Sequence, residues 1–296
     1  MNQTAIIIGC HTSNDTKIKS LKYNIARFKE LSSKIFVINS QEFRGAIEEQ
    51  IPGVKVNYME NDSMLCHGKW ARMIPKLIKR FDEFILTNDS YTIVNPLDRF
   101  HKTYKSARFD HEKNEMVSVI DSREILDQTY WEDDNGPERH YPDFLRWYSR
   151  SGIKKWLKHF YEHKDKCETY LDVIRHLEIM SGEIFTACDS AYRVPHDYRG
   201  NIHFDSGMMD EWVGHKKYPI VKLKYLSTLE TDFYIPEDFN SDEYKTLNGD
   251  LVHLNSEEAR EHFKNHGLSE GRAYKSSQRP REFPISISKL LPQDII

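Results

Sequence analysis

A short apolar run that ends in three polar residues, FILT at residues 84–87 followed by NDS at 88–90, decides how this chain is organised. The apolar part has the length and the composition of a β-strand. In open α/β sheets, ligands bind beyond the carboxyl ends of the strands, where residues 88–90 would lie. The segment therefore predicts a strand of the core and a polar site at its end.

Comparable runs flank this segment on both sides. Strands are expected at residues 5–9, 34–39 and 54–58, and another at 116–120. Between these strands, apolar residues recur at helical spacing over 18–31 and 70–78, which predicts two helices. Such alternation predicts an α/β fold with a mostly parallel, Rossmann-like sheet and helices on its faces.

The second half of the chain is expected to begin helically. Apolar residues at helical spacing predict helices over 144–160 and 170–187, with Gly182 as a candidate break in the second, followed by a strand-like run at 219–226. Residues 127–140 form a long polar loop, which is either a lid or an insertion.

Composition indicates a globular chain and excludes several classes of partner. The 296 residues carry 42 basic and 46 acidic side chains, so no basic surplus favours nucleic acid. The four cysteines form no close pair, which predicts a reducing compartment and neither a disulfide framework nor a zinc site. No apolar run has the length of a membrane span or a signal peptide, so a soluble, cytoplasmic protein is expected.

A change of composition near residue 226 predicts three parts. These are an α/β domain at 1–228, a small helical module at 229–275 and a tail at 276–296. Within the module, helices are expected at 241–247 and 256–265, with Ser256 as the N-cap of the second.

Asp89 is the strongest candidate for a metal ligand. A carboxylate at the end of a strand can hold Mg²⁺ or Mn²⁺, which in turn holds a diphosphate, since phosphate oxygens and water complete the shell. The alternative is an Asp that caps the next turn, because Asn-Asp-Ser is ordinary turn chemistry.

Polar residues at the ends of the other strands should reach the same edge of the sheet. The expected nucleotide-binding side chains are His11, Thr12, Asn39, Asn61 and Asn88. The alternative is that they are ordinary loop residues. No glycine-rich loop follows the first strand, which disfavours a dinucleotide site or a P-loop.

Two lysines and two carboxylates complete the candidate site. Lys69, near the start of a helix, is expected to meet a diphosphate, and Lys222 to pair with a phosphate or an internal carboxylate. Asp121 and Glu178 are the candidates for the general base that deprotonates an acceptor hydroxyl. For each of these residues, an ordinary surface or capping role is the alternative.

Several segments together resemble a known family. FILTNDS with NPL at 95–97, CHGKW at 66–70 and YPIVK at 218–222 resemble the rhamnan-synthesis protein F family of glycosyltransferases, and EIMS at 178–181 is similar to another of its elements. The resemblance covers about residues 1–228. It implies a GT-A type fold, with NDS in place of the usual Asp-x-Asp metal motif.

The resemblance also implies an activity. It points to metal-assisted, inverting transfer of a hexose or deoxyhexose from a nucleotide sugar to a glycan or glycoprotein acceptor. Similar domains occur in large DNA viruses, which would place the protein in the host cytoplasm or the virion.

The C-terminal part carries a second resemblance. DFNSDEY at 238–244, LNGDL at 247–251 and EGR at 270–272 resemble a short helical module that recurs beside sugar-transferase domains. Asp250, His262 and Arg272 are expected to lock its two helices together.

The leading hypothesis is thus a glycosyltransferase, and two alternatives stay open. One is a carbohydrate- or nucleotide-binding module without turnover, because Asn88 and Ser90 depart from the metal motif. The other is a nucleotidyltransferase, which shares the fold class and the use of a metal but usually has a glycine-rich segment after the first strand.

Overall fold

The computed structural model describes residues 3–12, 15–110, 115–122, 140–185, 187–195, 209, 211–223, 239–263, 272 and 274. Contacts divide the chain into two compact units, Met1–Asn201 and Ile202–Ile296. The domain boundaries expected at 228/229 and 275/276 stay a prediction.

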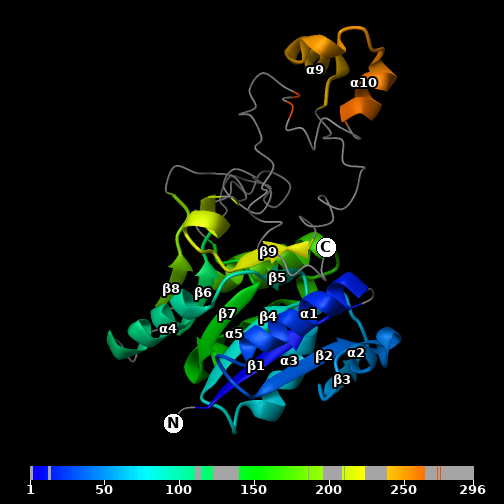
Figure 1. Ribbon diagram of the computed structural model, residues 1–296. Coiled ribbons are helices and arrows are strands. Elements are labelled where there is room, and N and C mark those ends of the chain that lie inside the picture. Colours follow the sequence, from blue (N-terminus) through cyan, green and yellow to red (C-terminus); the bar gives the residue numbers. More distant parts are fainter. Residues whose placement is uncertain are drawn as a thin grey trace. The chain divides into compact units, whose positions relative to one another are not determined.

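A seven-stranded sheet with the order β3-β2-β1-β4-β7-β6-β8 forms the centre of the first unit (Figure 1). Its strands are β1 (Thr4–Gly9), β2 (Ile35–Ser40), β3 (Val56–Met59), β4 (Glu83–Asn88), β6 (Met116–Ile120), β7 (Leu145–Ser149) and β8 (Cys188–Tyr192). Neighbouring strands are parallel except at β7, which runs antiparallel to both β4 and β6. This confirms the prediction of a mostly parallel, Rossmann-like α/β sheet with helices on its faces.

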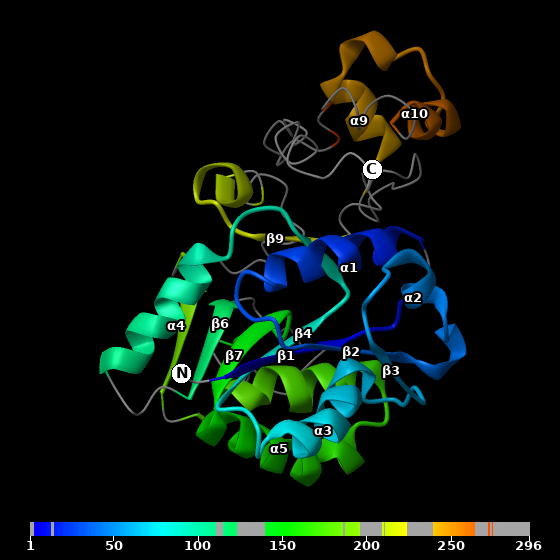
Figure 2. The same cartoon turned by 60° about the horizontal axis from the view of Figure 1, so that its bottom comes forward.

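Helices cover both faces of the sheet. Helix α1 (Asp15–Phe28) lies on one face, and α3 (Leu65–Leu77) and α5 (Arg150–His163) lie on the other (Figure 2). The remaining elements of this unit are η1 (Gln41–Phe43), α2 (Ala46–Gln50), β5 (Tyr91–Ile93), α4 (Asp98–Asp110), η2 (Lys164–Lys166), α6 (Tyr170–Val173), the π-helical turn η3 (Ile174–Ile179) and η4 (Met180–Gly182).

The main core lies between α3, α5 and the sheet. Trp70 and Trp156, one from each helix, are 1% exposed and pack edge to face with ring centroids 6.1 Å apart. Burying a large apolar side chain contributes about 1.5–3 kcal/mol or more, so both tryptophans help to hold the helices to the sheet. Trp70 Nε1 also donates to the Thr87 carbonyl, which satisfies the one polar atom of the indole.

The helix predicted over 144–160 is wrong at its start. Residues Leu145–Ser149 form β7, and α5 begins only at Arg150. Because β7 is buried on both faces, its residues lack the polar-apolar alternation of a half-buried strand. Tyr148 joins the core under α3 and α5, whereas Trp147 stacks on Tyr104 of α4 with centroids 4.0 Å apart.

The helix predicted over 170–187 stops at the candidate break, Gly182, and its last described residues are not helical. The helical turns end at Gly182, and β8 follows from Cys188 to Tyr192. This edge strand has the sequence CDSAY, which lacks the apolar run that marks the inner strands.

The second unit contains the expected short helices. Its described elements are η5 (Glu211–His215), β9 (Ile220–Lys222), α9 (Ser241–Leu247), η6 (Gly249–Leu251) and α10 (Ser256–His262). Tyr244, Leu251, Ala259, Phe263 and Tyr274 form their small core. Strand β9 lies within the predicted run at 219–226.

Of the three residues predicted to lock the two short helices together, only His262 joins α10 to α9 within the described contacts, and the predicted cap is wrong. Arg272 Nη1 donates to both carboxylate oxygens of Asp250 at 2.7 Å, and the Tyr244 hydroxyl lies 3.0 Å from His262 Nδ1. The N-cap of α10 is Asn255, whose side chain accepts two backbone N–H groups, and Ser256 is the first helical residue.

Some expectations fall outside the described residues. These are most of the loop at 127–140, the EG pair at 270–271 and the tail at 276–296. Among the described helices, none has the length and the apolar character that crossing a membrane requires.

Candidate functional site

The strand order reverses between β1 and β4. From β1 the chain continues outward to β2 and β3, and then returns to place β4 on the other side of β1. The carboxyl ends of such a pair form a topological switch point, where α/β sheets bind their ligands. Residues His11 and Thr12 follow β1, and Asp89 follows β4, so three of the predicted side chains meet there.

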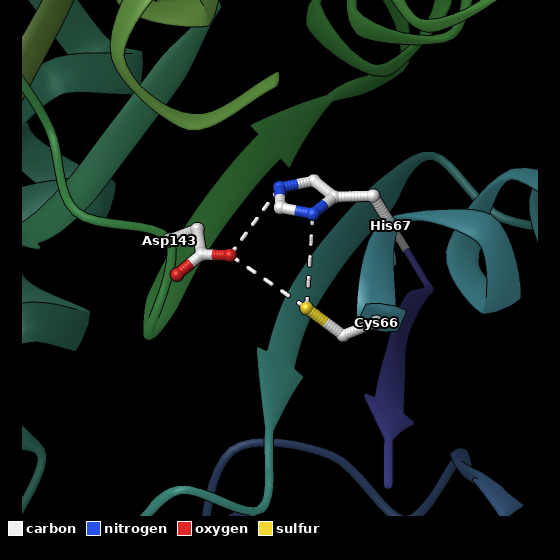
Figure 3. A group of neighbouring side chains, drawn as sticks. All are labelled: Cys66, His67 and Asp143. Atoms are coloured by element: carbon white, nitrogen blue, oxygen red, sulfur yellow. Dashed lines mark hydrogen bonds and ion pairs between the residues drawn. The ribbon is translucent and has the colours of Figure 1, made fainter. Parts of the chain in front are cut away.

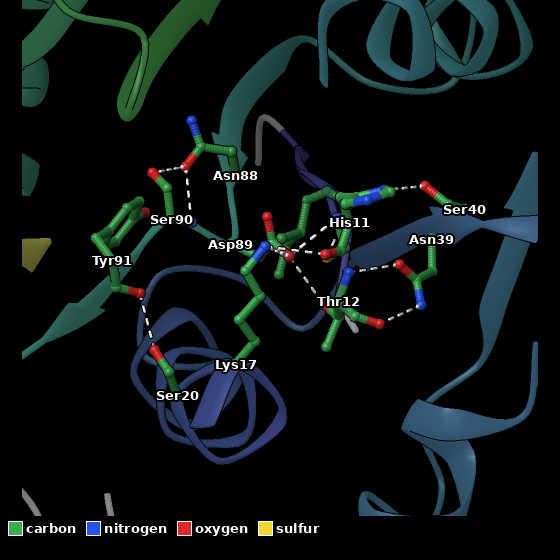
Figure 4. A network of polar contacts seen from close by, with 12 residues as sticks. His11, Thr12, Lys17, Ser20, Asn39, Ser40, Asn88, Asp89, Ser90 and Tyr91 are labelled. Carbon is green, nitrogen blue, oxygen red and sulfur yellow. Dashed lines mark hydrogen bonds and ion pairs between the residues drawn. The ribbon is translucent and has the colours of Figure 1, made fainter. Parts of the chain in front are cut away.

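Asp89 is held across this switch point by one of its two oxygens (Figure 4). Its Oδ2 accepts the backbone N–H of His11 and the hydroxyl of Thr12, each at 2.9 Å, and lies 3.6 Å from the Lys17 ammonium. No hydrogen bond from the described residues reaches Oδ1. The carboxylate is 7% exposed, so its position is fixed while one oxygen stays available.

The neighbouring residue Asn88 performs the turn chemistry. Its Oδ1 accepts the backbone N–H of Ser90 at 3.0 Å and the Ser90 hydroxyl at 2.6 Å. The role of capping the turn therefore belongs to Asn88, and Asp89 is directed toward the end of β1 (Figure 4).

Thr12 and Asn39 hold each other. The Thr12 N–H donates to Asn39 Oδ1 at 3.0 Å, and Asn39 Nδ2 donates to the Thr12 carbonyl at 3.5 Å. Both residues are fully buried, so they fix the loop after β1 against the end of β2.

Lys69 ties the ends of three strands together. Its ammonium donates to the Cys10 carbonyl at 2.7 Å, to Ser40 Oγ at 2.8 Å and to Asn61 Oδ1 at 3.3 Å. An ammonium has three N–H donors, so this arrangement uses all of them. Lys69 is 2% exposed, and burial lowers its pKa. In this structure Lys69 organises the site, and Asn61 is one of its anchors.

His11 is a half-exposed side chain at this edge of the sheet. Its side chain is 45% exposed, Nδ1 lies 2.8 Å from Ser40 Oγ, and the ring packs edge to face on Phe43 at 4.9 Å. Burial and the neighbouring Lys69 and Lys17 ammonium groups lower its pKa, so the ring is neutral at neutral pH. A neutral, half-exposed imidazole suits stacking on a planar base.

Lys17 is a site residue that sequence reasoning missed. It lies at the start of α1, and its ammonium donates to the His11 carbonyl at 2.9 Å beside Asp89. The available signal was its place in the first turn of the helix that follows β1, since that helix start faces the same edge of the sheet.

The predicted general bases lie elsewhere along this edge. Asp121 is 2% exposed and its Oδ1 accepts the Val194 N–H at 2.8 Å, which fixes the chain after β8. Glu178 lies in η3, is partly buried, and its Oε1 accepts the Asp143 N–H at 3.4 Å. Lys222 lies in β9 of the second unit.

Comparisons with known proteins add a likeness of low similarity. No protein-family model matches the chain, and no curated protein sequence matches it. Among solved structures, 4-diphosphocytidyl-2C-methyl-D-erythritol synthase from Anaerococcus prevotii DSM 20548 is similar, with a TM-score of 0.42 and 10% identity over 67% of this chain and 89% of that chain.

A second solved structure is similar to the same extent. CMP:2-keto-3-deoxy-manno-octonic acid synthetase complexed with CTP has a TM-score of 0.41 and 13% identity, over 65% of this chain and 90% of that chain. At these values neither likeness carries an argument about substrate or reaction, so the resemblance to the rhamnan-synthesis protein F family stays a prediction.

The arrangement around Asp89 can accept a hard divalent cation as one ligand among several. Mg²⁺ is commonly held by one or two carboxylates together with phosphate oxygens and water. Asp89 Oδ1 provides one such oxygen, whereas the Asn88 amide oxygen is occupied by Ser90. The site thus fits a metal ion that arrives with a phosphorylated ligand better than one bound by protein alone.

Proposed function

We propose that the chain is a glycosyltransferase whose nucleotide-sugar donor binds at the carboxyl ends of β1, β2 and β4. One observation carries this proposal: Asp89 is fixed across the switch point, with Oδ1 available and the Lys17 ammonium 3.6 Å from Oδ2. A fixed carboxylate beside an ammonium suits a diphosphate with its Mg²⁺ or Mn²⁺ ion, because both signs of charge find a partner.

The residues divide the work of binding and transfer. His11 offers a half-exposed ring to the base of the nucleotide, and Lys17 offers positive charge to the phosphates. A metal ion at Asp89 would neutralise the negative charge of the departing nucleoside diphosphate. Lys69, Asn39 and Thr12 keep this edge in place, so their contribution is to position the groups that touch the donor.

Glu178 is the better of the two proposed general bases. Both carboxylates accept a backbone N–H, but Asp121 is 2% exposed whereas Glu178 is only partly buried. A base must reach the acceptor hydroxyl, which favours the more accessible carboxylate. Glu178→Gln should abolish transfer while donor binding persists.

Nucleotidyl transfer is the second candidate, and the Asp89–Lys17 pair also suits it. An ammonium beside a metal-binding carboxylate can neutralise a triphosphate as readily as a nucleotide sugar. The two reactions leave different products: glycosyl transfer releases a nucleoside diphosphate, whereas nucleotidyl transfer to a sugar phosphate releases pyrophosphate.

The test combines binding with product analysis. The melting temperature of the full chain is measured with a panel of nucleotide sugars and nucleoside triphosphates, each with and without Mn²⁺. A ligand at a hundredfold excess over its dissociation constant adds about 2.7 kcal/mol of stability. A metal-dependent shift with slow release of nucleoside diphosphate supports glycosyl transfer, and release of pyrophosphate in the presence of a sugar phosphate supports nucleotidyl transfer.

Asp89→Asn and Asp98→Asn form a matched pair for this test. Both remove one carboxylate, but Asp98 is an exposed residue of the first turn of α4. The metal-dependent shift should disappear only in Asp89→Asn. Binding without any turnover over hours would replace the transferase by a binding module.

A further inference from the structure

Cys66, His67 and Asp143 form a compact side-chain cluster (Figure 3). Cys66 and His67 lie in the first turn of α3, and Asp143 precedes β7. Because β7 is antiparallel to β4 and pairs Leu145 with Thr87, its amino end lies at the carboxyl end of β4. This pairing brings Asp143 to residues 77 positions away in the sequence.

The three ligand-type atoms are close to one another and largely removed from water. Asp143 Oδ2 lies 3.6 Å from Cys66 Sγ and 3.3 Å from His67 Nε2, and the ligand atoms that the three residues offer all lie within 4.8 Å of one another. His67 is 2% exposed and Asp143 is 6% exposed. The cluster is therefore a buried group and not a chance gathering of surface side chains.

His67 has a buried nitrogen that lacks a hydrogen bond. Its Nε2 accepts or donates none among the described residues, although Asp143 Oδ2 is only 3.3 Å away. A buried polar atom without a hydrogen bond lowers the free energy of unfolding by about 1–3 kcal/mol, so a bound ligand that pairs with Nε2 would remove this cost. The ring is held between Trp70 at 5.0 Å and Trp156 at 6.2 Å, which fixes the direction of Nε2.

We propose that Cys66 Sγ, His67 Nε2 and Asp143 Oδ2 bind a divalent metal ion of the zinc type. Tetrahedral zinc with ordinary bond lengths places sulfur and oxygen ligands about 3.6 Å apart, and nitrogen and oxygen ligands about 3.4 Å apart. The observed separations are 3.6 Å and 3.3 Å. Three protein ligands leave a fourth position for water or a substrate atom.

The ligand types select against the metals proposed for Asp89. Magnesium and manganese prefer oxygen ligands, whereas thiolate and imidazole ligands favour zinc. Binding releases the Cys66 thiol proton to solvent, so that one thiolate and one carboxylate balance the two positive charges of the ion. The sequence predicts no zinc site because its cysteines are sparse. A site with one cysteine and a ligand far away in the sequence forms no recognisable spacing motif.

The backbone around Cys66 is shaped to place it. Leu65 has φ 54°, in the left-handed region that non-glycine residues rarely occupy, and it turns the chain into α3 directly before Cys66. A Cβ at Gly9 would lie 3.0 Å from Cys66 Cβ, so only glycine lets the end of β1 approach this closely.

The experiment measures metal binding by the full chain, independently of any activity. The protein is stripped with a chelator, kept reduced, and titrated with Zn²⁺ against a chromophoric competitor. We expect one tightly bound Zn²⁺ per chain. Replacement by Co²⁺ should give the thiolate-to-cobalt charge-transfer absorption, which reports directly on sulfur ligation.

Two variants and two controls make the test specific. Cys66→Ser should abolish the charge-transfer band, and Asp143→Asn should weaken Zn²⁺ binding by about tenfold or more. Cys188→Ser, at another partly buried cysteine, should change neither. Asp89→Asn should also leave the band intact, which separates this site from the donor site of the proposed function.

Zn²⁺ and Co²⁺ binding by the wild-type protein tests the proposed metal site even if a variant fails to fold. Absence of stoichiometric Zn²⁺ binding would overturn the proposal, and so would a Co²⁺ complex without a charge-transfer band. A band that persists in folded Cys66→Ser protein would overturn it as well.

Discussion

The Asp89 carboxylate accepts the backbone N–H of His11 at 2.9 Å, so the end of β4 is tied to the end of β1 where the strand order reverses. This bond makes Asp89 part of the framework of the site as well as a candidate ligand. A substitution at Asp89 therefore changes stability and binding together, and the choice of side chain separates the two.

Asp89→Asn should retain most of the stability that Asp89→Ala loses. The amide keeps an oxygen acceptor for His11 and Thr12, whereas alanine leaves these two donors unsatisfied at about 1–3 kcal/mol each. Urea unfolding followed by tryptophan fluorescence measures the difference. Equal losses in the two variants would show that the hydrogen bonds to Oδ2 contribute little.

Lys69→Met should destabilise the first unit by about 3 kcal/mol, because three acceptors at the ends of β1, β2 and β3 lose their shared donor. Arg72→Met is the matched control on the same helix, since Arg72 is 46% exposed and its ion pair with Asp62 contributes about 0–1 kcal/mol. Urea unfolding of both variants provides the comparison, and similar midpoints would contradict the role assigned to Lys69.

Gly152→Ala should destabilise the protein although alanine is the better helix former. A Cβ at this position would lie 2.0 Å from the Glu115 carbonyl oxygen, so α5 must shift away from the chain entering β6. We expect a loss of about 1–3 kcal/mol in thermal or urea unfolding. Lys154→Ala on the exposed face of α5 should stay within about 0.5 kcal/mol of wild type.

His140 should make the folded state less stable as the pH falls from 6.5 to 4. Burial, with a contribution from Arg146, lowers its pKa from 6.5 to about 4. Between these values the unfolded chain binds the additional proton, so the free energy of unfolding decreases by up to about 3 kcal/mol as the pH falls through this window. His140→Gln keeps the backbone bridge to Ser122 and should make the dependence less steep, while His67, whose pKa burial also lowers to about 4, retains its own contribution.

Urea unfolding at several pH values between 4 and 7 tests this expectation. His253→Gln, at an exposed histidine, is the control and should follow the wild-type curve. A His140→Gln curve as steep as that of wild type would assign the pH dependence to other groups.

Asn255→Ala should destabilise α10 by about 1 kcal/mol, whereas Ser256→Ala should have little effect. The Asn255 side chain accepts the N–H groups of Glu257 and Glu258, and Glu258 returns a hydrogen bond to the Asn255 N–H. Amide hydrogen exchange within α10 measures the change locally. Faster exchange in Ser256→Ala than in Asn255→Ala would restore Ser256 as the cap.

The inner strands could be predicted because burial on both faces demands uninterrupted apolar runs. Strands β1, β2 and β4 have such runs, and their order along the chain predicts that Asp89, His11 and Thr12 share one edge. Strand β7 was not predicted because its apolar residues also fit helical spacing. Strand β8 was not predicted because an edge strand can be polar.

The sequence by itself determined the α/β class and the edge of the sheet where the candidate site lies, since both depend on local apolar runs and their order. Tertiary structure decided which atoms meet at that edge. In the folded chain, Asp89 Oδ2 accepts a hydrogen bond from the end of β1, and the Lys69 ammonium donates to three acceptors. Asp143 lies next to Cys66 and His67. These contacts depend on the pairing of β7 with β4 and on the direction of each side chain, and such long-range geometry leaves no local pattern in the sequence.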